Sequence, residues 1–489
     1  MKPAGRIHKF ENYMNKRNQG LSILVLLVVA AAPSFSLDRA RFVELNKQGR
    51  ELRKKQDWPA MRQVLVEIGK EMPGLTPTYA LRMASVETHL GNQQAALQWM
   101  ERYAAMGLTY NLAGDDDLKP LLAEVGWKKI GAQMEHDTAP VMHADQVCTL
   151  PIADLMPEDL TFDKTSGSFI VSSIQHHSLY RVALPKGADA KKYVNCSLQE
   201  LPLEAQAKRW PTMAVSFDPA RKLVWMTSSA IPDFSGFPKE DEGKSSLLAV
   251  DAGSGKVVRR FDLESNAPAV LGDMSVSANG TVYVSDSLGG GVYRVQGSMD
   301  KASLEKAKLE KIADGLFSPQ TPVLAADGNR LFVPEYPLGI AVVDLTGGGK
   351  ITELAHPDNL AVTGLDGMHL VGDSLIGIQN GTEPERIVRF RLNHAQTEIE
   401  SAEIIVQSDP RLGEPTHGIA VDGWVYVLAN VGWDKIDDHG KLKEGANFTP
   451  PVLLRFPVND SEKSSEKARP RIPGDENAGR TDSRDPRCF

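Results

Sequence analysis

The ten residues GIAVDGWVYV, at positions 418–427, contain two runs of strand-forming residues on either side of an Asp-Gly pair. Val, Ile, Tyr and Trp favour strands, and Asp-Gly between two such runs favours a tight hairpin, because both turn residues tolerate positive φ. The arrangement recurs with Asn-Gly in residues 276–284 and, with one residue more, around Asp327-Gly328. The chain therefore repeats a hairpin.

Looser copies of this hairpin occupy residues 160–171, 214–226 and 368–378, which makes six copies. The copies are spaced by about 45 to 60 residues, and most are followed by a third strand of the form apolar-x-apolar. Repeats of this size, each a few strands long, predict an all-β six-bladed propeller, which we expect over residues 141–458. The third strands are expected at 178–182, 247–251, 291–295, 340–344, 387–391 and 452–456.

The composition is that of an ordinary globular protein: 489 residues, 42% hydrophobic and 24% charged. The net charge of −8 argues against general nucleic-acid binding. Three cysteines exclude a disulfide-dense scaffold and a multi-cysteine zinc site.

Residues 37–136 have helical periodicity and form a second predicted domain, all-α and tetratricopeptide-like. Two helical pairs, 41–72 and 78–106, align at a period of about 35 residues, and HLGNQQAALQWM (89–100) resembles the tetratricopeptide repeat most closely. Because three repeats are usually needed, we expect residues 118–134 to supply a capping helix or pair. Two roles stay open: a collar that packs on its neighbour, or a groove for a protein partner.

The apolar run LSILVLLVVAAA (21–32) is too short to span a bilayer comfortably. Basic residues precede it and small residues, Ser34 and Ser36, follow it, so we predict a secretory signal peptide over residues 1–36. The alternative is an uncleaved anchor helix. Cleavage would leave an exported protein, periplasmic or secreted, without a stable membrane span.

Export would permit disulfides. Cys148 and Cys196 could pair, which leaves Cys488 in the tail. The tail, residues 459–489, is polar and is expected to be disordered.

Polar residues occupy the position just before the first strand of nearly every copy. In a propeller these first strands line the central channel, so the side chains would converge at its mouth from different blades. Carboxylate and amide oxygens on separate rigid strands are what calcium prefers. The alternative is that they satisfy strand ends and channel water. The pairs are Glu158-Asp159, Thr212-Met213, Gly272-Asp273, Gln320-Thr321, Asp366-Gly367 and Thr416-His417.

Three of these segments carry a family resemblance. EDLTFD (158–163) resembles the opening motif of the senescence-marker-protein, gluconolactonase and luciferin-regenerating-enzyme-like family, and the Glu-Asp-Leu of the related paraoxonase propeller. Residues 320–328 resemble the family's Asn-Gly-Leu-Ala-x-x-x-Asp-Gly run, and Asp366-Gly367 resembles its Asp-Gly before a strand.

The resemblance implies a six-bladed propeller that hydrolyses a lactone or ester with a divalent cation, calcium or zinc. Carried over residue by residue, the metal ligands would be Glu158, Gln320 and Asp366. The family's third-blade Asn falls on Gly272, where Asp273 is adjacent and would replace it. Gln320 stands where the family has Asn. We expect calcium rather than zinc.

The hydrolase hypothesis gives the cation the role of a Lewis acid on the carbonyl oxygen of a small lactone or ester. Asp366, Asp273 or His417 would act as general base. His176-His177 could add an imidazole from a loop, and His369 is expected in the core or channel wall. The second hypothesis is a non-catalytic binding module for a protein or carbohydrate partner.

Overall fold

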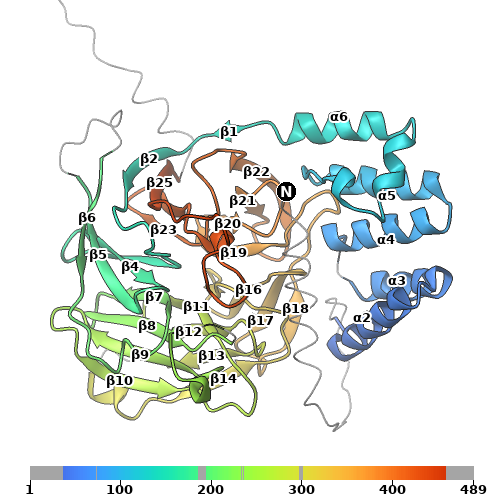
Figure 1. Ribbon diagram of the computed structural model, residues 1–489. Coiled ribbons are helices and arrows are strands. Elements are labelled where there is room, and N and C mark those ends of the chain that lie inside the picture. Colours follow the sequence, from blue (N-terminus) through green and yellow to red (C-terminus); the bar gives the residue numbers. More distant parts are fainter. Residues whose placement is uncertain are drawn as a thin grey trace, which may run out of the picture.

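The computed structural model describes residues 37–72, 74–185, 194–232, 234, 236–296 and 301–458, and these form a ring of six antiparallel sheets beside a layer of helices (Figure 1). The predicted six-bladed propeller is therefore confirmed. The predicted signal peptide (1–36) and disordered tail (459–489) lie outside the described residues, as does Cys488. Within the described part of the chain, no helix is long and apolar enough to cross a membrane.

Blades 1 to 3 each consist of four strands in sequence order. Their first strands, β3, β7 and β11, belong to the inner ring, where β3 contacts both β7 and the first strand of blade 6. Blade 1 contains β3 (Leu160–Asp163), β4 (Ser168–Ser173), β5 (Ser178–Ala183) and β6 (Ser197–Glu200); blade 2 contains β7 (Thr212–Asp218), β8 (Leu223–Ser229), β9 (Ser245–Asp251) and β10 (Val257–Asp262); blade 3 contains β11 (Leu271–Val276), β12 (Val282–Asp286), β13 (Val292–Val295) and β14 (Leu309–Ala313).

Blades 4 to 6 continue the ring, and blades 5 and 6 each recruit a strand from the segment that precedes blade 1. Blade 4 contains β15 (Val323–Leu324), β16 (Arg330–Glu335), β17 (Gly339–Asp344) and β18 (Ile351–Glu353); blade 5 contains β19 (Leu365–Val371), β20 (Ser374–Gln379), β21 (Arg386–Leu392) and β22 (Ile399–Gln407), with β1 (Val141–Met142) outside it; blade 6 contains β23 (Gly418–Val421), β24 (Trp424–Ala429), β25 (Val452–Pro457) and β2 (Asp145–Thr149).

The hairpin at residues 418–427 forms as predicted. β23 pairs with β24 from Gly418↔Val427 to Val421↔Trp424, so Asp422 and Gly423 are the two loop residues. Their φ angles are +48° and +83°, which is the left-handed conformation that a two-residue hairpin loop requires. Local turn chemistry therefore sets the register of the inner strand of blade 6.

The strand β2 closes the ring, because it pairs antiparallel with the last strand of the propeller, β25. Blade 6 is thus built from both ends of the propeller segment. Its apolar residues pack against those of blade 1, and the rings of Phe169 and Tyr426 lie 4.7 Å apart between centroids. Closure of this kind joins the first and last segments of the propeller within one sheet.

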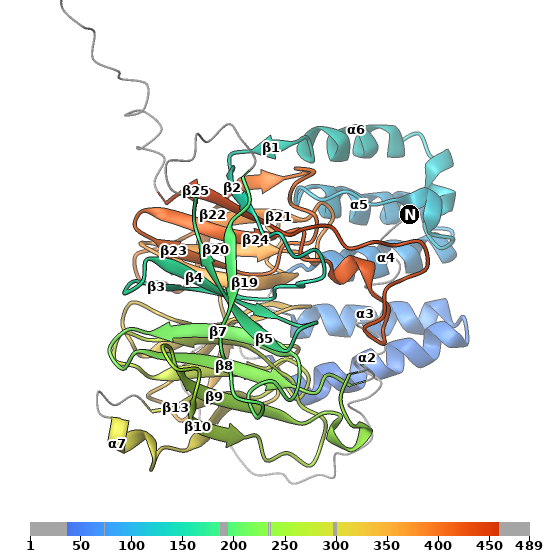
Figure 2. The ribbon, with the colours of Figure 1, turned by 60° about the vertical axis from the view of Figure 1, so that its left-hand side comes forward.

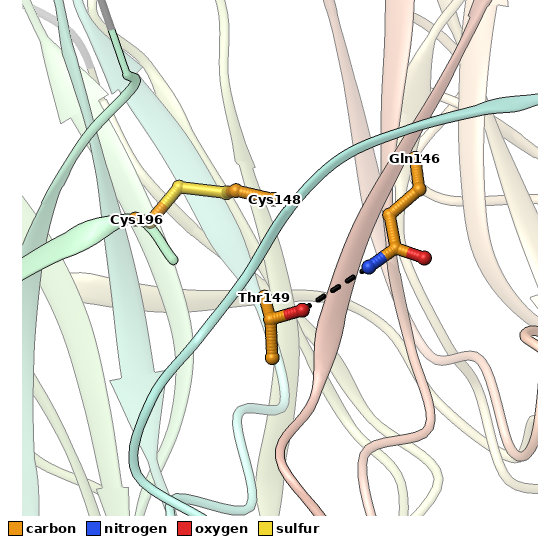
Figure 3. Close-up of a disulfide and its surroundings, with 4 residues drawn as sticks. All are labelled: Gln146, Cys148, Thr149 and Cys196. Atoms are coloured by element: carbon orange, nitrogen blue, oxygen red, sulfur yellow. Dashed lines mark hydrogen bonds between the residues drawn. A yellow bond between two sulfur atoms is a disulfide. The ribbon is translucent and has the colours of Figure 1, made fainter. Parts of the chain in front are cut away.

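A disulfide between Cys148 and Cys196 cross-links the seam between blades 6 and 1, where the ring closes (Figure 3). Cys148 lies in β2 of blade 6, and Cys196 directly precedes β6, the outer strand of blade 1. Backbone hydrogen bonds lie beside it: the Cys196 amide donates to the Thr149 carbonyl at 2.9 Å. The cysteine pairing that the sequence left open is therefore present, and it joins the two blades that closure brings together.

Removing the disulfide should destabilise the propeller by about 2–4 kcal/mol, because it cross-links residues separated by 48 positions and restricts the unfolded chain. Cys148→Ser/Cys196→Ser should show this loss in urea unfolding, and reductant should produce the same loss in the unmodified protein. Cys488→Ser is the matched control and should behave as wild type. Equal stability of all three proteins would show that the seam is held by the sheet and core alone.

The helical layer consists of consecutive antiparallel pairs, α2 with α3 and α4 with α5, followed by shorter elements. Asp57 and Thr76 cap α3 and α4, and each side chain accepts a hydrogen bond from a backbone amide of the first turn. The pairing matches the predicted helices; their tetratricopeptide-like character stays a prediction. The elements are α2 (Arg39–Lys54), α3 (Trp58–Glu71), α4 (Pro77–His89), α5 (Gln93–Ala104), two 3-10 turns, η1 (Leu112–Gly114) and η2 (Lys119–Ala123), and α6 (Trp127–Asp137).

The layer packs along blades 4 and 5 (Figure 1). Figure 2 shows the helices at one end of the propeller strands. Arg39 of α2 forms ion pairs with Glu335 at 2.5 Å and with Glu353 at 2.8 Å, and its guanidinium lies over the ring of Phe317. Glu335 ends β16, the second strand of blade 4, which is the end of the blade where the inner strand begins. The helices therefore cover the face of the propeller on which the predicted site lies.

Arg39→Met should cost about 3–5 kcal/mol, since it leaves the carboxylate of the fully buried Glu335, and beside it that of Glu353, without a cation. Urea unfolding measures the loss, and limited proteolysis should show earlier cleavage between the helical layer and the propeller. Arg41→Met, at an exposed position of the same helix, is the control and should stay within about 0.5 kcal/mol of wild type. A small effect of both substitutions would mean that apolar contacts alone hold the layer.

Candidate metal centre

The six predicted positions all lie at the beginning of a first strand. Glu158 precedes β3, Gln320 precedes β15 and His417 precedes β23, while Asp273 and Asp366 lie within the first residues of β11 and β19. Thr212 is the first residue of β7, and all six residues are buried. Contacts described below link Glu158, Asp273, Asp366 and His417 across blades, so the repeated register brings these four residues together at the same end of their inner strands.

Three of these residues form a compact cluster. One ligand atom each of Glu158, Asp366 and His417 lies within 4.8 Å of the other two. The three come from blades 1, 5 and 6, which are consecutive around the closed ring. The sequence indicated Glu158 and Asp366 as ligands but gave His417 the role of a base; the structure places its imidazole in the same donor group.

His417 also reaches across the channel. Its Nδ1 is 2.8 Å from the Glu158 carbonyl oxygen, and its Nε2 hydrogen-bonds to Oδ1 of Asp273 in blade 3, opposite blade 6 in the ring. Burial lowers the pKa of the imidazole, but the carboxylates of Asp273, Asp159 and Asp366 outweigh it and raise that pKa well above its ordinary value. The pair thus places opposite charges at the centre of the propeller.

The two carboxyl groups of blade 1 serve different partners. Glu158 accepts a hydrogen bond from the indole Nε1 of Trp433, and burial and the nearby Asp366 carboxylate raise its pKa well above the ordinary value. Asp159 turns towards blade 2 and accepts from the Val215 amide at 2.8 Å. Burial raises the pKa of Asp159 to about 7. Glu158 therefore faces the channel, whereas Asp159 joins two inner strands.

Asp366 is oriented by residues that the sequence did not indicate. The Asn380 amide donates to Oδ2 of Asp366 at 2.5 Å, and the Tyr336 hydroxyl donates to Oδ1 of Asn380 at 2.9 Å. Asn380 begins a glycosylation-like Asn-Gly-Thr triplet, but its side chain is buried beside the site. Its position directly after β20 was the one signal that could have drawn attention to it.

Gln320 and Thr321 of blade 4 complete the ring of polar groups. The Gln320 amide donates to the carbonyl and the hydroxyl oxygens of Ser318, both at 3.0 Å. Thr321 donates to the backbone carbonyl of Asp366 at 3.1 Å. The Gln320 amide nitrogen therefore bonds within its own loop.

The other histidines take different positions. His176 contacts the Tyr180 hydroxyl at 2.7 Å and pairs with Asp154 at 3.4 Å. His177 lies near Gly236 of blade 2, in positive φ. His369 lies in β19 with a buried Nε2 that lacks a hydrogen-bond partner, and burial lowers its pKa to about 4. None of them belongs to the cluster; His369 lies on the inner strand, as expected for the channel wall.

Apolar side chains cover the mouth. Trp433, Ile436 and Phe448, from the connection between β24 and β25, pack with Phe234 of blade 2 and with Met156, which precedes β3. This apolar cluster limits access of water to the carboxylates beneath it, which strengthens the electrostatic interactions among them. The indole of Trp433 links the apolar cover to Glu158 directly.

The donor set is suited to a cation. Three buried carboxylates, Glu158, Asp273 and Asp366, face one imidazole, and like charges held this close repel one another unless a proton or a cation intervenes. Two carboxylates and one imidazole that converge from rigid strands are common ligands of divalent metals. Glu158, Asp366 and Nε2 of His417 would hold the ion, because Nδ1 faces a backbone carbonyl. The Nε2 atom is bonded to Asp273 in this structure, so an ion would take the place of the Nε2 proton and release the Asp273 carboxylate.

Fold and site define this chain as a six-bladed propeller with an acidic, histidine-containing channel mouth. No family model matches it, and no curated protein matches it. Similar solved structures include a gluconolactonase from Xanthomonas campestris (13% identity, 65% of this chain and 89% of the other, TM-score 0.39), a calcium-binding protein, regucalcin, from Agrobacterium tumefaciens (15%, 65% and 93%, 0.41) and a PQQ-bound aldose sugar dehydrogenase from Streptomyces coelicolor (14%, 64% and 96%, 0.41). The fold assignment rests on the six sheets themselves.

Removing one partner of the Asp273–His417 ion pair should lower the free energy of unfolding more than removing both, because a single substitution leaves the other charge buried without a partner. Asp273→Asn and His417→Gln should each lose about 3–5 kcal/mol, and the double variant should lose clearly less than the sum. Urea unfolding in the presence of chelator measures the cycle without a contribution from metal. The control cycle uses Glu51 and Lys54, an exposed pair at 3.0 Å, and should give a coupling near zero. Additive losses at Asp273 and His417 would contradict the pairing.

Proposed function

We propose that this protein binds one divalent cation through Glu158, Asp366 and His417 and hydrolyses a small lactone or ester at the channel mouth. The observation that carries the proposal is the convergence of the three ligand atoms, from three blades, within 4.8 Å. Asp273 stands on the opposite side of the channel, and the bound cation would replace its hydrogen bond to Nε2 of His417.

The imidazole in the donor set favours a zinc-like ion. Calcium takes oxygen ligands, six to eight of them, whereas zinc and manganese accept imidazole nitrogen together with carboxylate oxygen. The sequence favoured calcium because it placed Gln320 and Asp273 among the ligands. With Gln320 turned to Ser318 and His417 in the cluster, we propose zinc or manganese instead.

When bound, the cation would polarise the substrate carbonyl and stabilise the developing oxyanion. Asp273 is the carboxylate outside the ligand set, so it is the residue placed to accept a proton from water. Trp433 and Asn380 hold the carboxylates of Glu158 and Asp366 in place by hydrogen bonds. Of the three candidate bases that the sequence offered, Asp366, Asp273 and His417, this proposal keeps Asp273 and makes the other two metal ligands.

The second candidate is a non-catalytic propeller whose cation fastens the blades. Burial favours it: Asp273 and His417 are each 2% exposed, beneath the cover of Trp433 and Phe448. Such a protein would serve as a binding module for a protein or carbohydrate partner, with the helical layer as part of its surface. Export to the periplasm or the medium is proposed for either candidate and is supported by the disulfide, since disulfides persist in oxidising compartments.

A thermal melt with zinc, manganese, calcium or chelator tests the cation site. An ion that binds only the folded state raises the Tm with its concentration. We expect the largest rise with zinc or manganese, and its loss in Glu158→Gln and in Asp366→Asn. Asp344→Asn, in the turn after β17, is the matched control and should keep the full rise. Absence of a rise with every ion would overturn both the metal site and the hydrolase.

Hydrolysis of lactones and aryl esters separates the two candidates. If Asp273 is the base, Asp273→Asn should lower kcat by about 10²-fold or more while the metal-dependent rise in Tm stays. A metal-dependent Tm without hydrolysis of any substrate in the wild-type protein would favour the non-catalytic module.

A further inference from the structure

A second cleft lies between the helical layer and blade 5, away from the channel. Its volume is about 210 Å³, below the roughly 300–1,000 Å³ of sites for drug-sized ligands, so it suits a small molecule. Residues 105–107, which follow α5, form one wall, and strands β21 and β22 form the other. The polar side chains on the blade 5 wall are Arg386 and Gln407.

Arg386 is a buried cation, 3% exposed, whose recorded partners are all uncharged. Its Nε donates to Oε1 of Gln379 at 2.7 Å, and its Nη1 donates to the carbonyl oxygens of Met106 and Gly107 at 3.2 and 3.0 Å. Among the hydrogen bonds of the described residues, none is donated by Nη2. Burial lowers the pKa of Arg386 to about 10, with only the Tyr103 hydroxyl opposing the effect. A buried guanidinium without a carboxylate partner is suited to an anion.

Gln407 stands directly beside Arg386, because the two are partners in the β21–β22 ladder. Cross-strand partners place their Cβ atoms about 4.5–5.5 Å apart on the same face of a sheet. The Gln407 amide nitrogen donates to the carbonyls of Asp137 and Ala139, at 2.8 and 2.9 Å. Its Oε1 is buried and has no hydrogen-bond partner, so a residue that lines the cleft carries an acceptor that lacks a donor.

The rest of the lining is mostly apolar and includes Leu360, Val388 and Phe390. The one carboxylate in the lining, Asp137, receives hydrogen bonds at its own helix end from Gln133 at 3.0 Å and is paired with His136 at 2.9 Å. Arg386 is the cation of this lining, Oε1 of Gln407 is its unpaired acceptor, and the walls are mostly apolar. A complementary ligand has one negative charge, one hydrogen-bond donor close to that charge, and a hydrocarbon chain.

We propose that this cleft binds a small hydroxycarboxylate with a short apolar chain. The carboxylate pairs with Nη2 of Arg386, the hydroxyl donates to Oε1 of Gln407, and the chain lies against Val388 and Phe390. The adjacency of Arg386 and Gln407 in the ladder matches the short separation of the two groups in a 2- or 3-hydroxy acid. This site does not depend on the channel cluster, and its occupancy is measured without metal.

Calorimetric titration of the full chain in chelator, with 2-hydroxybutyrate as the probe, tests the proposal. Butyrate lacks the hydroxyl and 2-hydroxybutyramide lacks the carboxylate, and each should bind at least about tenfold more weakly. Equal binding of the three compounds, or no binding of 2-hydroxybutyrate at millimolar concentration, would overturn the proposal.

Two variants locate the binding. Ala402→Phe fills the cleft from β22 without touching its polar groups and should abolish binding. Arg386→Gln should abolish it as well; if that variant fails to fold, Ala402→Phe and the three probes still decide. Glu158→Gln is the matched control in the channel and should bind 2-hydroxybutyrate as wild type does. Retained binding in Ala402→Phe would place the ligand elsewhere and overturn the assignment.

Discussion

Pairing of β2 with β25 is the constraint on which the rest of the structure depends. A propeller converges its inner strands only when the ring is closed, and here the closing strand comes from the segment between the helices and blade 1. The same segment contributes β1 to blade 5. Closure therefore positions α6 against blade 5, brings Cys148 to Cys196 and sets Glu158 beside Thr416, whose hydroxyl donates to the Glu158 carbonyl at 2.7 Å.

The convergence of buried carboxylates from several blades has an electrostatic cost, because like charges repel and have lost their contact with water. Three carboxylates and one imidazole are buried at the channel mouth, and their donors of hydrogen bonds come from other blades or from loops. Trp433 donates a hydrogen bond to Glu158, and Asn380 donates one to Asp366. His417 donates one to Asp273. These partners stabilise the buried acids without neutralising all of them, and a dication would add the missing positive charge.

The repeated elements were predictable from sequence because local chemistry decides them. Asp422-Gly423 fixes a hairpin, and the spacing of the copies fixes the register that places Glu158, Asp273, Asp366 and His417 at one end of their blades. The partners of these residues were not predictable. Trp433 and Asn380 lie in connections without periodicity, and their contacts depend on how blades pack across the ring. Arg39 was hidden for the same reason, since its acids lie about 300 positions away.

The helical layer lies at the same end of the propeller strands as the channel cluster, and it forms part of the second cleft. Arg386 donates hydrogen bonds to the Met106 and Gly107 carbonyls, which follow α5, and these bonds fix the position of its guanidinium. The cleft is therefore formed jointly by the helical layer and blade 5. Hydrolysis of a lactone yields a hydroxycarboxylate, which is the class of molecule that the cleft is suited to hold. If both proposals hold, the cleft would bind the class of product that hydrolysis at the channel releases. The collar interpretation of the helices follows from this geometry more directly than a separate peptide groove, because the residues that pack on blade 5 also form the wall of the cleft.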